Sequence, residues 1–206
     1  MIEKDSYKTI TKASEGVLFK DRNSKFFGYA FPVTSEEEVK QHLETLKKQH
    51  HQAGHFCYAY QIGKTAQELS YRANDDGEPN NSAGMPIYGQ IQSFEVTDIL
   101  IVVLRYFGGT KLGVSGLINA YKTTAEMGLN ASKIVKRTIN VRYAVRFDYK
   151  NMGKVMRIAK EKNLNIVAQT LELSCEIIIS VRLKKSQEIF EIFDAIFEVE
   201  IKNLND

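Results

Sequence analysis

The chain has few cysteines and no long apolar run. Its two cysteines, Cys57 and Cys175, stand far apart within apolar segments, so the sequence predicts no disulfide framework and a reducing compartment. No apolar stretch approaches the roughly 20 residues that a helix needs to cross a bilayer. The first residues, MIEKDSYKTITK, mix charges and lack the apolar core of a signal peptide. These absences predict a cytoplasmic protein with no membrane partner.

A large excess of one charge is also missing. The formal net charge is +3, and division of the chain at Arg137 leaves both parts close to neutral. Proteins that bind nucleic acids non-specifically usually carry a strongly basic surface, so the totals give weak support for a polyanionic partner. The length of 206 residues allows one large domain or two small ones, each able to bury a core.

The most distinctive part of the chain is its centre, residues 71–120. This stretch holds over half of the thirteen glycines and two of the three prolines. Within it, Ile99–Leu104 is an unbroken apolar run, which predicts a strand buried on both faces. An acidic loop (residues 75–84, DDGEPNNSAG) precedes this strand, and a glycine loop (residues 106–113, YFGGTKLG) follows it and leads into a helix. Loops of this kind are the best candidates for a functional site.

The remaining patterns predict two domains, residues 1–131 and residues 137–206, joined by a short linker. In the first domain, strands are expected at 16–20, 24–31 and 55–62, and a helix at 35–50. In the second, alternation at 139–147 begins a β-α-β-β-α-β order, with later strands at 164–171, 175–183 and 197–201 and a helix from Ser186. That order is the ferredoxin-like split unit, and the overall fold class is α+β. The outward positions of this second sheet are mixed in sign and contain no aromatic residue, which favours cross-strand ion pairs over an RNA platform.

The glycine loop does not match a nucleotide-binding motif. In a P-loop, Lys and then Ser or Thr directly follow the last Gly, but here Lys111 precedes Gly113. The G-x-G-x-x-G spacing of a dinucleotide site is absent as well, so no cofactor is predicted. Free backbone N–H groups at a helix start, together with Arg105 and Lys111, suit a phosphate. A tight turn that packs a helix on a sheet explains the same glycines equally well.

Two other groups of residues suggest chemistry. Asp75, Asp76 and Glu78 could hold a divalent cation, but a surface turn is favoured because no alternation of metal ligands is present. His55 and Cys57 stand two apart on a strand and hence on one face. They could form a nucleophile and base, although a buried cysteine on a strand is the commoner arrangement. No metal site is predicted.

The motifs His55-Phe56-Cys57, DDGEPNNSAG at 75–84 and RYFGGTKLGVSGLINAY at 105–121 resemble those of the IMPACT family, specifically its bacterial YigZ-like branch. The resemblance covers the whole chain. It implies an N-terminal α/β domain similar to domain IV of elongation factor G, and a ferredoxin-like C-terminal domain similar to domain V of that factor. Eukaryotic members of the family regulate translation. The resemblance also implies a binding site for an unassigned ligand at His55, Asp75, Asp76, Gly77, Glu78, Pro79, Ser82, Gly84, Arg105, Tyr106, Gly108, Gly109, Thr110, Lys111 and Gly113.

Two functions follow from these features. The favoured one is a non-enzymatic regulator linked to translation, which binds RNA, a nucleotide or a ribosome-associated protein at a cleft between the two loops. The alternative is an enzyme that acts on a small phosphorylated or peptide-like substrate, with Asp76 or His55 as acid–base. In both cases the two loops are expected to converge, with Arg105 or Lys111 paired to a carboxylate of the acidic loop.

Overall fold

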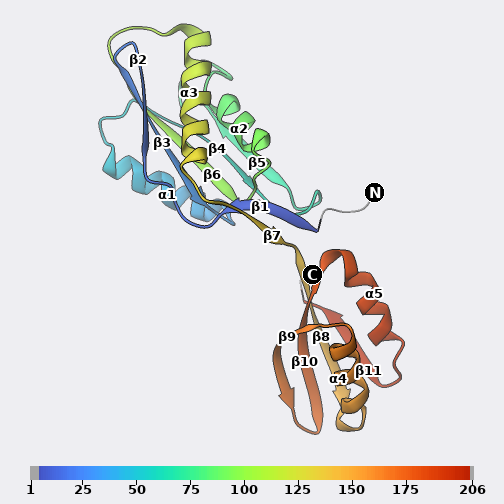
Figure 1. Ribbon diagram of the computed structural model, residues 1–206. Helices are drawn as coiled ribbons and strands as arrows, with labels where there is room; N and C mark the ends of the chain where they lie inside the picture. The colour runs from blue at the N-terminus through green and yellow to red at the C-terminus, as the bar shows by residue number, and fades with distance from the viewer. Residues whose placement is uncertain (1–4, 205–206) are drawn as a thin grey trace. The chain divides into compact units, whose positions relative to one another are not determined.

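The computed structural model describes residues 5–204 and divides the chain into two compact units (Figure 1). The first unit is Tyr7–Arg137. The second consists of the residues from Thr138 onward together with Asp5 and Ser6. Within residues 5–204, no helix is both long enough and apolar enough to cross a membrane.

The first unit is built on a five-stranded sheet in which all neighbours are antiparallel. The strand order is β2 (Val17–Asp21), β3 (Ser24–Pro32), β6 (Ile99–Tyr106), β4 (His55–Ile62) and β5 (Ser70–Asn74). The apolar run 99–104 lies in the central strand and is fully buried, as the sequence predicts. Because the sheet is antiparallel, the unit is α+β, whereas the family resemblance implies an α/β domain.

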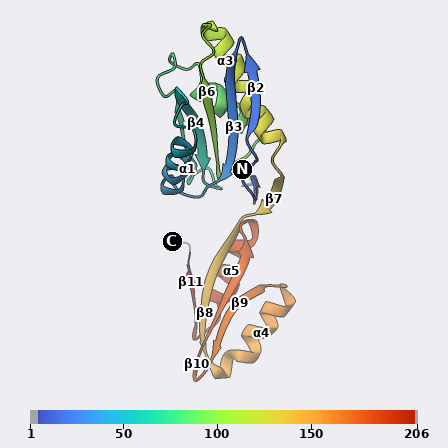
Figure 2. The ribbon, with the colours of Figure 1, turned by 90° about the vertical axis from the view of Figure 1, so that its left-hand side faces the viewer.

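Helices cover both faces of this sheet, which explains why the central strand needs no polar alternation. α2 (Gly84–Ser93) and α3 (Gly113–Asn130) lie on one face, and α1 (Glu36–Gln49) lies on the other (Figures 1 and 2). Ile101 and Val103 of β6 pack in the core under α2 and α3, and Leu100 and Val102 pack in the core under α1. Full burial of each such aliphatic side chain contributes about 1.5–3 kcal/mol.

Residues 132–137 are expected to form a linker, but most of this segment, from Ile134 onward, lies in a strand. β7 (Ile134–Thr138) pairs with β1 (Ser6–Ile10) in a two-stranded sheet. Ile10 is buried in the core on the α2 and α3 side, and Ile134 packs against the same core. The apolar contacts of these two isoleucines therefore extend the first unit beyond the boundary that composition indicates.

The second unit is a four-stranded antiparallel sheet in the order β11, β8, β10, β9. Its elements are β8 (Asn140–Asp148), η1 (Tyr149–Asn151), α4 (Met152–Glu161), β9 (Asn165–Leu171), β10 (Ser174–Arg182), α5 (Leu183–Asp194) and β11 (Val199–Asn203). Two expected boundaries are wrong. α5 begins at Leu183 and not at Ser186, whose hydroxyl donates to the Leu183 carbonyl inside the first turn. The last strand begins at Val199, and Phe197 is 85% exposed.

The sheet surface of the second unit carries ion pairs, as its mixed charges predict. Arg146 and Glu176 are register partners on β8 and β10, and Arg146 Nε lies 2.5 Å from Glu176 Oε2.

The N-terminal segment joins this unit through Asp5. Its carbonyl accepts from the Ile139 N–H at 2.8 Å, and its carboxylate lies 3.2 Å from Arg182 Nε.

α1 has a side-chain cap at its start and a half-buried histidine at its end. The Ser35 hydroxyl accepts from the Glu38 N–H at 3.3 Å, while the Glu38 carboxylate accepts from the Thr34 N–H instead of completing a capping box.

His50 lies between two tyrosine hydroxyls, with Nε2 2.9 Å from Tyr29 Oη and Nδ1 2.9 Å from Tyr106 Oη. A cation would suit the C-terminal end of a helix, but burial lowers the pKa of His50 and favours the neutral ring.

This histidine predicts a pH dependence of stability. Because the pKa of His50 is lower in the folded protein, the unfolded chain binds more protons once the pH falls below the ordinary histidine pKa. The free energy of unfolding should therefore fall between about pH 7 and pH 5. Urea unfolding across this range should show a smaller fall for His50→Gln than for the wild type. If the free energy of unfolding falls equally in the variant and the wild type, His50 does not contribute to the pH dependence. His42 would then be the source, because burial also lowers its pKa.

Candidate functional site

The acidic loop is held by its own carboxylates. Asp75 Oδ1 accepts from the N–H groups of Ala83 at 3.0 Å and Gly84 at 2.8 Å, and Oδ2 accepts from Asn81 at 2.9 Å. Asp75 thus caps the start of α2, where N–H groups have no partner within the helix. Its acceptor oxygens serve this structural contact, which argues against the metal-binding role considered from the sequence.

Asp76 ties the acidic loop to the start of β4. Its Oδ2 accepts from the Phe56 N–H at 2.7 Å, and its carbonyl accepts from His55 Nδ1 at 2.8 Å. The backbone of Asp76 has a φ of 43°, and Gly77 continues the left-handed turn at 85°. Since Nδ1 of His55 is the donor to a carbonyl, the neutral ring keeps its lone pair on Nε2.

Glu78 is the centre of a buried polar cluster. Its Oε1 lies 2.7 Å from Arg105 Nη1 and accepts from the Tyr121 hydroxyl at 2.8 Å. The exposed fraction of the side chain is 4% for Glu78 and 7% for Arg105. His55 Nε2 lies 3.9 Å from the same oxygen. Burial raises the pKa of Tyr121, so its hydroxyl stays protonated and acts as a donor. The expected ion pair between the two loop regions is therefore Arg105–Glu78.

Arg105 also lies between two aromatic rings. The centre of its guanidinium is 5.6 Å from the Phe26 ring and 5.4 Å from the Phe107 ring. Its Nε is buried and has no hydrogen-bond partner among the described residues. Phe107 is 58% exposed, so one end of this stack reaches solvent. Arg105 thus connects the buried cluster to the glycine loop.

Cys57 does not have the environment of a nucleophile. It is fully buried, and its thiol donates to the Asp75 carbonyl at 3.0 Å. Burial raises the pKa of the Cys57 thiol, and the neighbouring carboxylates do the same, so the reactive thiolate is disfavoured. Among residues 5–204, no group of three His, Cys, Asp or Glu side chains is arranged to hold a metal ion.

The glycines of both loops allow close approaches and left-handed turns. A Cβ on Gly108 would lie 2.1 Å from the Asn23 carbonyl carbon, and a Cβ on Gly84 would lie 2.5 Å from the Asn74 nitrogen. Gly109 and Gly113 have φ values of 86° and 74°, which favour glycine. Packing and turn geometry therefore account for these four glycines without a ligand.

The structure brings part of the expected site together and separates the rest. Around Glu78 lie His55, Asp76, Gly77 and Arg105, with Asp75, Pro79, Ser82 and Gly84 in the same loop. Tyr106 lies on the opposite face of the sheet, where it bonds to His50, because successive strand residues point to opposite faces. Thr110 and Lys111 are exposed on the glycine loop.

Tyr121 is the main member of the cluster that the sequence pattern did not assign to the site. It is the last residue of the motif at 105–121, but the sequence does not place it among the site residues. A fully buried tyrosine hydroxyl needs a hydrogen-bond partner, which is the signal that could have linked it to a carboxylate.

Comparisons with known domains, proteins and structures find similar proteins of one family. Residues 22–129 match the Impact N-terminal domain. The chain is 36% identical over 156 residues to the IMPACT family member YvyE of Bacillus subtilis, covering 76% of this chain and 70% of that protein. It is 29% identical over 140 residues to the IMPACT family member YigZ of Escherichia coli, covering 68% and 69%. A crystal structure described as a hypothetical protein has the same fold, with a TM-score of 0.70, 22% identity and coverage of 96% and 97%.

Proposed function

The chain belongs to the IMPACT family, and we propose that it is a non-enzymatic regulator linked to translation whose first unit binds single-stranded RNA at the glycine loop. The observation that carries this proposal is the contrast between the two loops. The acidic loop uses its carboxylates for internal contacts, whereas the glycine loop presents Phe107, Thr110 and Lys111 to solvent.

The exposed groups of the glycine loop match the two parts of a nucleotide. The Phe107 ring is mostly exposed, and the Arg105 guanidinium lies over it, 5.4 Å from the ring centroid. The exposed part of the ring can therefore stack on a base. Lys111 is a cation four residues further on. α3 starts at Gly113, and its N-cap residue, Leu112, has no side-chain acceptor, so the first N–H groups of the helix are available to a phosphate. Glu78 does not oppose a phosphate, because Arg105 neutralises it.

The connection to translation comes from the family. Its eukaryotic members regulate translation, as the resemblance implies. The family resemblance also implies a likeness to domains IV and V of elongation factor G, and from this implied likeness we infer a ribosomal setting for the RNA. The cytoplasm is the compartment that this role requires.

An enzyme remains the second candidate because of one observation. His55 Nε2 carries a lone pair, is partly exposed and lies 3.9 Å from Glu78 Oε1, an arrangement that a general base can use. The alternative role for Asp76 as the acid–base is not supported, since its carboxylate accepts the Phe56 N–H. A His55→Ala variant separates the two candidates, because it should abolish turnover of a small substrate but leave RNA affinity unchanged.

We expect the protein to bind fluorescein-labelled oligo(U) with an affinity that falls as salt rises, because bound cations displace counterions from the phosphates. Lys111→Ala should weaken binding and reduce the salt slope by about one unit. Phe107→Ala should weaken binding by about 1–3 kcal/mol through the loss of one stacked base. Fluorescence anisotropy across a salt series measures both effects.

Lys122→Ala is the matched control, because Lys122 is an exposed lysine on α3, well beyond the helix start. Its removal should change affinity little and leave the Phe107 effect intact. No binding to oligo(U) at low salt would contradict the RNA proposal and would favour a protein partner. Equal effects of Lys111→Ala and Lys122→Ala would contradict the assignment of the site to the glycine loop.

A further inference from the structure

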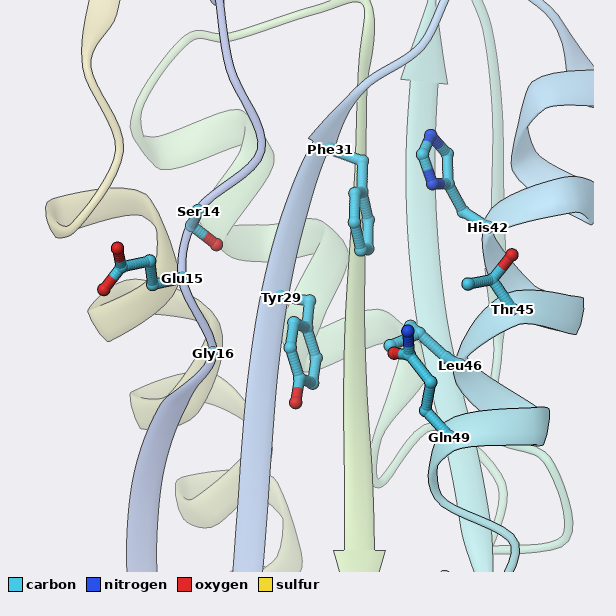
Figure 3. Close-up of a pocket in the computed structure, with 9 residues that line it drawn as sticks. All are labelled: Ser14, Glu15, Gly16, Tyr29, Phe31, His42, Thr45, Leu46 and Gln49. Carbon is cyan, nitrogen blue, oxygen red and sulfur yellow. The ribbon is translucent and has the colours of Figure 1, made fainter.

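The aromatic rings of the groove between β3 and α1 make internal contacts. Tyr29 and Phe31 of β3 form the floor of this groove (Figure 3). His42 of α1 stacks on Phe31, with ring centroids 4.2 Å apart. Gly16 lies so close to the Tyr29 ring that an added Cβ would stand 2.7 Å from it. Both rings therefore serve the packing of the first unit, and the groove does not indicate a ligand.

The second unit has an open sheet edge at β9. This strand ends the four-stranded sheet, and β10 is its only strand partner among the described residues (Figure 1). All residues of β9 except Ile166 are exposed. A free edge presents unpaired backbone N–H and C=O groups, which can form a ladder with another extended chain.

Charged side chains often protect edge strands from such pairing, and β9 lacks this protection. Its sequence, NIVAQTL, contains no charged residue. Each of the other edge strands within residues 5–204 has at least one: Lys8 on β1, Lys20 and Asp21 on β2, Arg72 on β5, Lys136 and Arg137 on β7, and Glu200 and Lys202 on β11. The edge of β9 is therefore the one best suited to pairing with a further strand.

A β-bulge limits the length of this edge. The register between β9 and β10 shifts between Ile178 and Ile179, so that Val167 has no partner on β10. A bulge increases the local twist and discourages pairing at an edge. Residues 168–171 keep a regular register with β10. The surface for strand pairing is therefore short, and association through it should be weak.

The side chains around Gln169 indicate the occupant, because their pattern is symmetric. When β9 pairs antiparallel with its own copy about a twofold axis at Gln169, this residue faces itself, and its amide can both donate and accept. On either side, Ala168 faces Thr170 of the copy. Beyond them Val167 faces Leu171, and these two apolar side chains are 45% and 44% exposed. Apolar residues thus meet each other, and no like charges stand opposite each other.

We propose that β9 pairs with β9 of a second copy of this chain, so that the sheet of the second unit continues across a twofold axis. The interface is isologous, since both copies contribute the same residues. It is independent of the RNA contact proposed for the glycine loop, because the two surfaces share no residue.

Sedimentation velocity of the full chain over a concentration series should show weak dimerisation, with a Kd above about 1 μM. Gln169→Lys places two lysines opposite each other and should raise this Kd about fivefold, and Gln169→Glu should do the same with two carboxylates. An equimolar mixture of the two variants pairs a lysine with a carboxylate. The mixture should therefore dimerise at least as well as the wild type, a rescue that only pairing between copies explains.

Gln187→Lys is the matched control, because Gln187 is an exposed glutamine of α5 that lies outside β9. It should leave the Kd unchanged. An absence of dimers up to about 1 mM protein would overturn the proposal, as would equal Kd values for Gln169→Lys and the wild type. A mixture of the Lys and Glu variants that stays monomeric would also contradict it, and would leave the β9 edge to a strand of another protein. Since no RNA is present, these outcomes are separate from the result of the oligo(U) experiment.

Discussion

Replacement of Glu78 by alanine is expected to lower the free energy of unfolding by about 3–5 kcal/mol. The reason is that Arg105 would stay buried without its carboxylate, and the Tyr121 hydroxyl would lose its acceptor. Arg105 Nε already has no hydrogen-bond partner among the described residues, so the buried guanidinium depends on its contact with Glu78. A loss of this size is a large part of the roughly 5–15 kcal/mol that stabilises an ordinary domain. Urea or thermal unfolding of the purified variant measures it.

Two further variants test the cause of this effect. In the double variant Glu78→Leu with Arg105→Met, no charge is left buried, so most of the stability should return. Glu37→Ala breaks an exposed ion pair with Lys40, in which both side chains are over 60% accessible, and should cost under about 1 kcal/mol. If Glu78→Ala costs no more than Glu37→Ala, the cluster is not the structural centre of the acidic loop.

Gly108→Ala is expected to have the second large effect, a loss of about 1–3 kcal/mol or more. The added Cβ would lie 2.1 Å from the carbonyl carbon of Asn23 and 2.4 Å from the nitrogen of Ser24. Both are backbone atoms, one in the turn between β2 and β3 and the other in the first residue of β3, and neither can move aside as the end of a side chain can. The hydrogen bond from the Gly108 N–H to the Ser24 hydroxyl would be strained as well. Thermal unfolding should show the lower transition temperature.

Two other glycines provide controls of different kinds. Gly89 lies within α2, and a Cβ added there would have open space for 4 Å around it, so Gly89→Ala should stabilise the protein by about 0.5–1 kcal/mol. Gly109 also has free space, but its φ of 86° makes alanine unfavourable by about 1 kcal/mol. A Gly108→Ala loss no larger than that of Gly109→Ala would show that the contact with Asn23 relaxes easily.

The strands that the sequence predicts well are those whose burial follows from their own side chains. β4 begins and ends at the predicted residues, His55 and Ile62, and β6 contains the whole apolar run. β5 was not predicted, because its sequence SYRAN has no apolar alternation and its residues are exposed or only partly buried. An edge strand of this kind forms because β4 offers it a hydrogen-bonding partner, which local sequence does not reveal.

In the candidate site, too, some contacts follow from the sequence and others do not. Charge balance was sufficient to predict that a cation would pair with the acidic loop, and Arg105 does so. The roles of Asp75 and Asp76 could not be predicted, because each carboxylate binds N–H groups of segments that only the fold brings near. Tyr106 was misplaced for a simpler reason. The sequence motif places Arg105 and Tyr106 in one site, but β6 continues to Tyr106 and therefore directs the two side chains to opposite faces.

The pairing of β1 with β7 has a consequence for how the protein can be divided. The chain enters the first unit after Ser6 and leaves it after Arg137, so the first unit is an insertion within the second. A single cut between Arg137 and Thr138 separates the chain into two polypeptides and leaves Asp5 and Ser6 on the one that carries the first unit. A fragment that starts at Thr138 would lack Asp5, and with it the ion pair to Arg182 and the acceptor for the Ile139 N–H. The isolated fragment 138–206 should therefore unfold at a lower temperature than the second unit of the intact chain.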